Sequence, residues 1–300
     1  MATTSLTAKD AENRDFWRSL AASLSIESAA PPSPARLGDA GDIKRLLGDL
    51  RREGYVQVED AFPTEVFAPL RAAVATLVER KIPLPFLFVY DEPWRAFQGV
   101  SAFLSATLGE KYRALPDFWV WHVAPADGNM GWGPHRDRVQ PTLDGENNPY
   151  TLTVWLPFSD ATPLNGCIYM LPAHLDERFK RRVWDGEGNN VVHNPQDVRA
   201  LPAKAGSMLA WNQAVLHWGG RASRLAKEPR VSAAFEFQRG DRSAYNQPLL
   251  DPAVIPPFAR RLGLIGKQVL QYQHMYPLTP DVAAVAQSLV DRHMHGAHVL

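Results

Sequence analysis

The chain contains Gly133-Pro134-His135-Arg136-Asp137-Arg138, a stretch with the pattern of one arm of a metal site. Because residues i and i+2 of an extended segment point to the same side, the side chains of His135 and Asp137 can meet at one ion while Arg136 points away. A lone His-x-Asp pair is more often a surface turn. The pair therefore predicts a metal site only if a further ligand lies elsewhere in the chain.

A second histidine of the right kind, His217, lies downstream and is followed by Arg230, which opens a strand-like segment with Ser232 on the same face. Two histidines and one carboxylate occupy one side of an ion and leave the other positions open, which suits non-heme Fe(II) oxygenases. A guanidinium can bind the carboxylate of an acidic cosubstrate through two hydrogen bonds, and a nearby hydroxyl can add a third. Arg221 and Arg224 are rivals for this role, but they lie in a turn-rich segment.

Composition limits the kinds of partner and the compartment. The 300 residues are 45% hydrophobic and 21% charged, enough for one large domain or two small ones. Lys plus Arg and Asp plus Glu balance at 32 each, so we expect a small-molecule substrate and neither nucleic acid nor a membrane as partner. The single cysteine, Cys167, excludes an intrachain disulfide, a cysteine zinc finger and an iron–sulfur cluster. Without a signal-like or membrane-spanning apolar run, the expected location is cytoplasmic.

Residues 1–38 are predicted to be an N-terminal extension, with a short helix within 8–24 and a Pro-rich linker at 29–34. This tail is expected either to pack loosely or to mediate contacts in a homodimer. Residues 39–300 are predicted to form a single domain.

Periodicity and capping signals place the regular elements of that domain. Thr279 and Pro280 have the types preferred at the N-cap and first position of a helix. The expected elements are a helix over 42–54, a strand over 55–58, a helix from Thr64, an extended segment over 83–90, a helix over 93–108, and C-terminal helices within 250–300 at 258–271 and 280–293.

Two further strands are predicted to line the interior. Residues 118–122 are aromatic and alternate, so one face carries Trp119 and Trp121 and the other carries His122. Core packing is the simpler interpretation, whereas the functional one puts His122 or a tryptophan against a ligand. Residues 150–158 also alternate, with Trp155 on the polar face, where an indole can stack on a planar ligand and donate a hydrogen bond.

Residues 155–174 resemble the central block of the phytanoyl-CoA dioxygenase family of Fe(II)/2-oxoglutarate oxygenases. The shared features are Trp155, a polar turn at Asn165-Gly166-Cys167, and a short apolar strand that ends in Pro172-Ala173-His174. The family has a Gly-Ser pair where this chain has the single residue Ala173. With His217 and Arg230 matched to the family's distal histidine and cosubstrate arginine, the resemblance covers residues 40–240.

The resemblance implies a mainly β chain with flanking helices, a double-stranded β-helix (jelly-roll, cupin-like) whose N-terminal and C-terminal helices pack on the larger sheet. It also implies Fe(II) on His135, Asp137 and His217, with 2-oxoglutarate and O2 as cosubstrates. Arg230 would bind 2-oxoglutarate, with Trp155, Ser232 and His122 as further candidates near it; these four and the three metal ligands are the predicted site residues. The expected reaction is hydroxylation of an unactivated C–H of a small organic molecule, with release of succinate and CO2. Because related halogenases lack the carboxylate ligand, Asp137 argues against halogenation, while desaturation, epoxidation and ring formation stay open.

Residues 175–201 are predicted to be a lid-like insertion between two strands. The simplest interpretation of its cationic residues is a solvated face. They could also bind an anionic substrate such as an acyl-CoA. Three other interpretations remain: a cupin-type isomerase or dioxygenase without 2-oxoglutarate, a non-catalytic ligand-binding barrel, and an ordinary β-sandwich in which the His-x-Asp pair and the distal histidine are coincidental. The first would not need the Arg230 and Ser232 pair, and the second would be indicated by a missing metal ligand.

Overall fold

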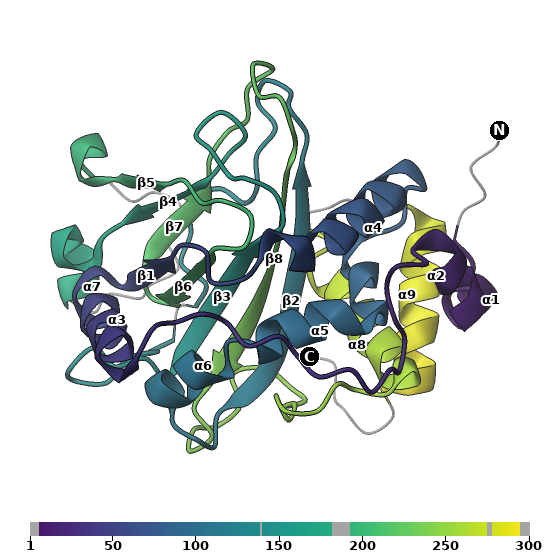
Figure 1. Ribbon diagram of the computed structural model, residues 1–300, viewed down its shortest axis with the longest axis horizontal. Helices are drawn as coiled ribbons and strands as arrows, with labels where there is room; N and C mark the ends of the chain where they lie inside the picture. Colours follow the sequence, from purple (N-terminus) through teal and green to yellow (C-terminus); the bar gives the residue numbers. More distant parts are fainter. Residues whose placement is uncertain (1–5, 139, 182–192, 275–277, 295–300) are drawn as a thin grey trace.

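The computed structural model describes residues 6–138, 140–181, 193–274 and 278–294, and two antiparallel sheets lie at its centre (Figure 1). The larger sheet has the order β1 (Tyr55–Val58), β6 (Met208–Asn212), β3 (Thr151–Pro157), β8 (Arg230–Gln238) and β2 (Arg113–Val123). The smaller has the order β5 (Arg199–Leu201), β4 (Ile168–Leu171) and β7 (Leu216–Gly219). Strands distant in sequence are neighbours in both sheets, so residues far apart in the chain can meet between them.

The two sheets pack through their inner faces. Trp155 and Leu209 of the larger sheet share one apolar cluster with Ile168 and Met170 of the smaller sheet. His135 pairs with β7 through an isolated bridge, which extends the smaller sheet by one position. The result is the double-stranded β-helix that the resemblance implied.

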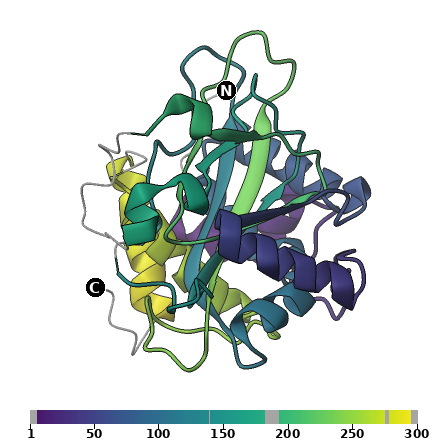
Figure 2. The same ribbon diagram turned by 90° about the vertical axis from the view of Figure 1, so that its left-hand side faces the viewer.

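Helices cover the outer face of the larger sheet, on the side away from the smaller one (Figures 1 and 2). In β3, Leu152, Val154 and Leu156 point into this outer core, while Thr153 and Trp155 point inward, as the alternation predicts. The helical elements are α1 (Ala8–Ala11), α2 (Arg14–Leu20), α3 (Ala40–Glu53), η1 (Thr64–Val66), α4 (Ala68–Glu79), η2 (Leu84–Val89), α5 (Asp91–Gln98), α6 (Ser101–Leu108), η3 (Ala173–Leu175), α7 (Glu177–Arg181), η5 (Pro195–Asp197), α8 (Phe258–Gln271) and α9 (Pro280–His293).

Three helices lie close to their predicted bounds. The Asp39 side chain accepts hydrogen bonds from two amides at the start of α3, and α3 ends at Gly54, whose φ of 83° is left-handed. The bounds of α8 and α9 are those predicted, and the Thr279 hydroxyl accepts from the amide of Val282.

The extended segment predicted over residues 83–90 is wrong. These residues form η2, and Phe86, Leu87, Phe88 and Val89 are each at most 1% exposed. A segment buried on all sides has an apolar run without any period, so its sequence does not separate a strand from a helical turn.

Around Trp17 the N-terminal segment packs tightly, so the expectation of a loose tail does not hold there, whereas residues 27–34 are exposed. Trp17 is fully buried and stacks on Phe86, with ring centroids 5.3 Å apart. The predicted single helix is two short ones, α1 and α2. Farther along, Ser25 and the amides of Glu27 and Ser28 bind the carboxylates that begin α5. Over the described ranges, no helix is long and apolar enough to cross a bilayer.

Candidate metal centre and pocket

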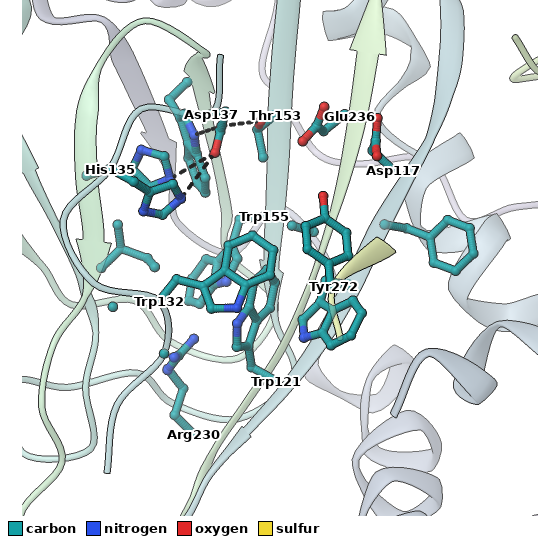
Figure 3. A pocket seen from close by; sticks show the side chains of 18 residues that line it. Asp117, Trp121, Trp132, His135, Asp137, Thr153, Trp155, Arg230, Glu236 and Tyr272 are labelled. Carbon is teal, nitrogen blue, oxygen red and sulfur yellow. Dashed lines mark hydrogen bonds and ion pairs between the residues drawn. The ribbon is translucent and has the colours of Figure 1, made fainter. Parts of the chain in front are cut away.

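His135, Asp137 and His217 converge at the inner face of the smaller sheet. Figure 3 shows His135 beside Asp137. One ligand atom from each lies within 4.8 Å of the others. Asp137 Oδ1 is 3.4 Å from Nε2 of both histidines, and their ring centroids are 4.3 Å apart. This spacing allows one ion with bonds of about 2 Å to contact all three side chains.

Hydrogen bonds orient each of these side chains. Nδ1 of His135 lies 2.6 Å from the Gly133 carbonyl and Nδ1 of His217 lies 3.2 Å from the Val215 carbonyl, so Nε2 of each ring is directed to Asp137. In the described structure, Nε2 of His135 is buried without a hydrogen-bond partner. Such carbonyl contacts fix the tautomer in which Nε2 binds a metal.

The carboxylate of Asp137 is held by its second oxygen. Oδ2 accepts hydrogen bonds from the Thr153 hydroxyl at 2.7 Å and from Trp211 Nε1 at 2.8 Å. Burial opposes ionisation, but the nearby charges of His217 and His135 and the Thr153 hydrogen bond lower the pKa of Asp137. Burial lowers the pKa of His217 to about 4. An ionised carboxylate and a neutral imidazole are the forms that bind a metal.

Arg230 lines the cavity next to these residues. Arg230 is 1% exposed, its Nη1 donates to the Ser232 hydroxyl at 2.9 Å, and its guanidinium lies 5.9 Å from the Trp155 ring. A Cβ on Gly131 would lie 2.8 Å from Arg230 Nη2, and one on Gly219 would lie 3.2 Å from it. The two glycines therefore leave room for the guanidinium.

Of the other residues predicted from the sequence, some line the cavity and some do not. Trp155 lines the cavity, and its Nε1 is buried with no hydrogen-bond partner in the described structure. His122 is not brought to the cavity, since it is on the opposite face of β2 from Trp121 and is half-buried there. Of the rival arginines, Arg221 is exposed, and Arg224 is exposed with its Nε 3.5 Å from Asp127.

The cavity-lining residues that sequence analysis missed include Asp117, Glu236 and Tyr272. Glu236 is six residues after Arg230 in β8, so the alternation of that strand could have placed it on the same face. Asp117 lies in a register shift of β2 between Ala114 and Phe118, which the sequence does not signal. Tyr272 caps α8, and only tertiary packing brings it here.

The predicted lid lies partly outside the described residues, which stop at 181 and resume at 193. In the described part, Phe179 of α7 packs with Ala173 and Ala214, and residues 199–201 form β5 at the edge of the smaller sheet. Among the described residues of this segment, none lines the cavity.

Comparison with known proteins agrees with this geometry. Residues 89–224 match the model of the family described as phytanoyl-CoA dioxygenase (PhyH). None of the curated proteins matches the chain. The similar crystal structures include the non-heme alpha ketoglutarate dependent epimerase SnoN from nogalamycin biosynthesis, EctD from S. alaskensis with bound Fe, and apo HygX from Streptomyces hygroscopicus.

The likeness to these structures extends over most of each chain. SnoN is 19% identical, with a TM-score of 0.53 over 67% of this chain and 84% of its own. EctD is 14% identical, with a TM-score of 0.51 over 78% of this chain and 95% of its own. HygX is 15% identical, with a TM-score of 0.50 over 68% of this chain and 90% of its own. At such identities the likeness supports the fold, a double-stranded β-helix with flanking helices.

Proposed function

Since residues 89–224 match the model of the phytanoyl-CoA dioxygenase (PhyH) family, we propose that the chain is an Fe(II)/2-oxoglutarate-dependent dioxygenase of that family. Its reaction would be the hydroxylation of an unactivated C–H of a small organic substrate, with release of succinate and CO2. One observation carries the proposal: the His135, Asp137 and His217 cluster and the buried Arg230 line the same cavity.

The three clustered side chains fit Fe(II). Two imidazoles and one carboxylate on one side of an ion are the donor set of non-heme iron oxygenases. Nε2 of His135, which is buried without a hydrogen-bond partner in the described structure, lies 3.4 Å from Asp137 Oδ1. EctD and SnoN have been crystallised with iron, and SnoN also with alpha ketoglutarate.

The other end of the cavity fits 2-oxoglutarate. The Arg230 guanidinium can hold the distal carboxylate through two hydrogen bonds, and Ser232 fixes its orientation. Trp155 offers a buried N–H for a cosubstrate oxygen. A cupin-type enzyme without 2-oxoglutarate would have no use for this buried cation, and a merely ligand-binding barrel would not need the complete metal cluster.

When bound, Fe(II) with 2-oxoglutarate and O2 supplies the oxidant that removes a hydrogen atom from the substrate. The chain itself contributes binding, orientation and exclusion of water. Thr153 and Trp211 keep the Asp137 carboxylate fixed, and the indoles of Trp121 and Trp155 make apolar walls. We further propose that the protein is cytoplasmic, where reducing conditions keep iron ferrous. We also propose that it forms a homodimer.

The proposal is tested by anaerobic titration of the metal-free protein with Fe(II) and 2-oxoglutarate. We expect a weak visible charge-transfer band from the chelated keto acid, and its loss in Asp137→Ala. Substrate-dependent succinate release, screened over a compound panel, then separates a dioxygenase from a binding protein. A protein that binds Fe(II) at this cluster but gives no band with 2-oxoglutarate would contradict the proposal.

A further inference from the structure

A second hollow, here called the outer hollow, adjoins the inner cavity, and Arg230 is not among its described lining residues. The two share five lining residues: Trp132, His135, Asp137, Glu236 and Tyr272. A molecule that enters from solvent through the outer hollow therefore meets Trp132, Tyr272 and Glu236 beside the metal ligands His135 and Asp137. In Figure 3 the Tyr272 ring lies beside Trp132, and Glu236 lies beyond its hydroxyl. We call this passage the junction.

With Glu236 ionised, the charge of the side chains at the junction is negative. Asp137 and Glu236 line the outer hollow, and none of its described lining residues is Lys or Arg. Behind it, one guanidinium serves two carboxylates, because Arg138 Nη2 donates both to Glu236 and, at 3.0 Å, to Asp117. Lys267, the other buried cation nearby, donates to Gln271. An anionic substrate such as an acyl-CoA does not fit this charge.

Of the two carboxylates that share Arg138, Glu236 is the one that a ligand meets. Asp117 is satisfied within the protein, because its oxygens also accept from Asn246 and Gln271, and its side chain is 2% exposed. The Glu236 side chain is 14% exposed and lines both cavities. Its carboxylate therefore retains a side open to an incoming donor.

Aromatic rings form the facing wall. The ring of Tyr272 lies 4.9 Å from that of Trp132 and 5.0 Å from that of Trp119, measured between centroids. Burial raises the pKa of Tyr272 well above its ordinary value, so the phenol stays neutral. Neutral aromatic faces beside a carboxylate attract organic cations, and most strongly where water is excluded.

We propose that the substrate carries a protonated amine or a quaternary ammonium group, which binds at the junction between the Glu236 carboxylate and the rings of Trp132 and Tyr272. The proposal rests on the proposed function, because it takes the molecule at the junction to be the one that is oxidised. Burial, with the nearby charges of Asp117 and Asp137, raises the pKa of Glu236 to about 8. The positive charge of a bound cation would stabilise the ionised form of the Glu236 carboxylate.

The test uses two probes of equal shape, choline and its neutral isostere 3,3-dimethylbutan-1-ol, titrated calorimetrically at pH 9, where Glu236 is ionised, into the full chain with Fe(II) and 2-oxoglutarate under argon. We expect choline to bind at least about tenfold more tightly, a difference of about 1.4 kcal/mol. Glu236→Gln should remove this preference, whereas the same change at the exposed Glu65 should leave it intact. Tyr272→Leu should weaken choline more than the alcohol.

The two probes are compared in the unsubstituted protein, and this comparison tests the proposal even if Glu236→Gln does not fold. Equal affinities, a preference for the alcohol, no binding of either probe, or a preference that survives in folded Glu236→Gln would overturn the proposal. The titrations are repeated on the metal-free protein without 2-oxoglutarate. Failure of the keto-acid band would refute the proposed function, while the choline preference is read independently of it.

Discussion

His135 and His217 exchange two backbone hydrogen bonds, with each amide nitrogen 3.0 Å from the carbonyl oxygen of the other. This bridge joins the loop after β2 to β7 and puts both imidazoles on the side of Asp137. The positions of the two rings are therefore set by backbone pairing, and what remains adjustable is the carboxylate between them.

The first prediction concerns the hydrogen bonds that hold that carboxylate. Thr153→Val removes the hydroxyl that donates to Asp137 Oδ2, and we expect the affinity for Fe(II) or Mn(II) to fall about 10- to 100-fold. Metal titration of the metal-free protein measures it. Thr151→Val is the matched control, because Thr151 is buried in the same strand and its hydroxyl has no hydrogen-bond partner in the described structure. Equal affinities in the two variants would show that the Thr153 contact does not support the metal.

A second prediction separates the candidate arginines. Arg230→Ala removes a buried guanidinium from the cavity wall, and loss of one partner of a buried charge pair costs about 2–5 kcal/mol. We expect the dissociation constant for 2-oxoglutarate to rise by at least about 30-fold, while Fe(II) still binds. Arg221→Ala, at an exposed position, should change neither. If Arg221→Ala weakened 2-oxoglutarate and Arg230→Ala did not, the cosubstrate would be bound elsewhere.

The sequence was most informative where chemistry is local. His135 and Asp137 are two apart, Arg230 and Ser232 are two apart, and period two puts each pair on one face of an extended segment. That His217 joins the first pair depends on sheet pairing, which spacing alone does not give. The family resemblance supplied that link, and the structure brings the three side chains together.

The parts that could not be predicted depend on tertiary contacts. Tyr272 reaches the junction from the end of α8, and Asp117 turns toward it because β2 is irregular there. His122 fits a ligand-binding role by residue type, but the register of β2 puts it on the opposite face from the cavity. The choice between the two faces of an aromatic strand is made by the surrounding helices, which the alternation alone does not reveal.

A third prediction tests whether the N-terminal segment is part of the domain. Trp17 is fully buried, stacks on Phe86 and accepts a hydrogen bond on its carbonyl from the Tyr90 hydroxyl. Trp17→Ala should lower the free energy of unfolding by about 3–5 kcal/mol, as for other buried large aromatic residues. Urea denaturation measures it, and the partly exposed neighbour Phe16 provides the control, Phe16→Ala, with a smaller loss. Equal losses, or none, would mean that this segment contributes little to the core.

The last prediction uses the ionisation of Glu236. Burial raises its pKa from the ordinary 4.5 to about 8, so between these pH values the folded chain keeps a proton that the unfolded chain has released. The folded state then binds more protons, and the contribution of Glu236 to the free energy of unfolding falls as pH rises, by at most about 1.4 kcal/mol per pH unit. Below pH 4.5 both states are protonated and this loss is absent.

Glu236→Gln has no such proton, while its amide oxygen can still accept from Arg138. Relative to the unsubstituted chain, the variant should therefore gain stability steadily from pH 5 to pH 8, whatever its stability at pH 5. Urea denaturation of both metal-free proteins at several pH values gives the difference, from which other titrating groups cancel. Glu65→Gln should show no such trend, since Glu65 is exposed. Parallel curves for Glu236→Gln and the unsubstituted chain would mean that Glu236 is ionised in the folded protein throughout, held by Arg138.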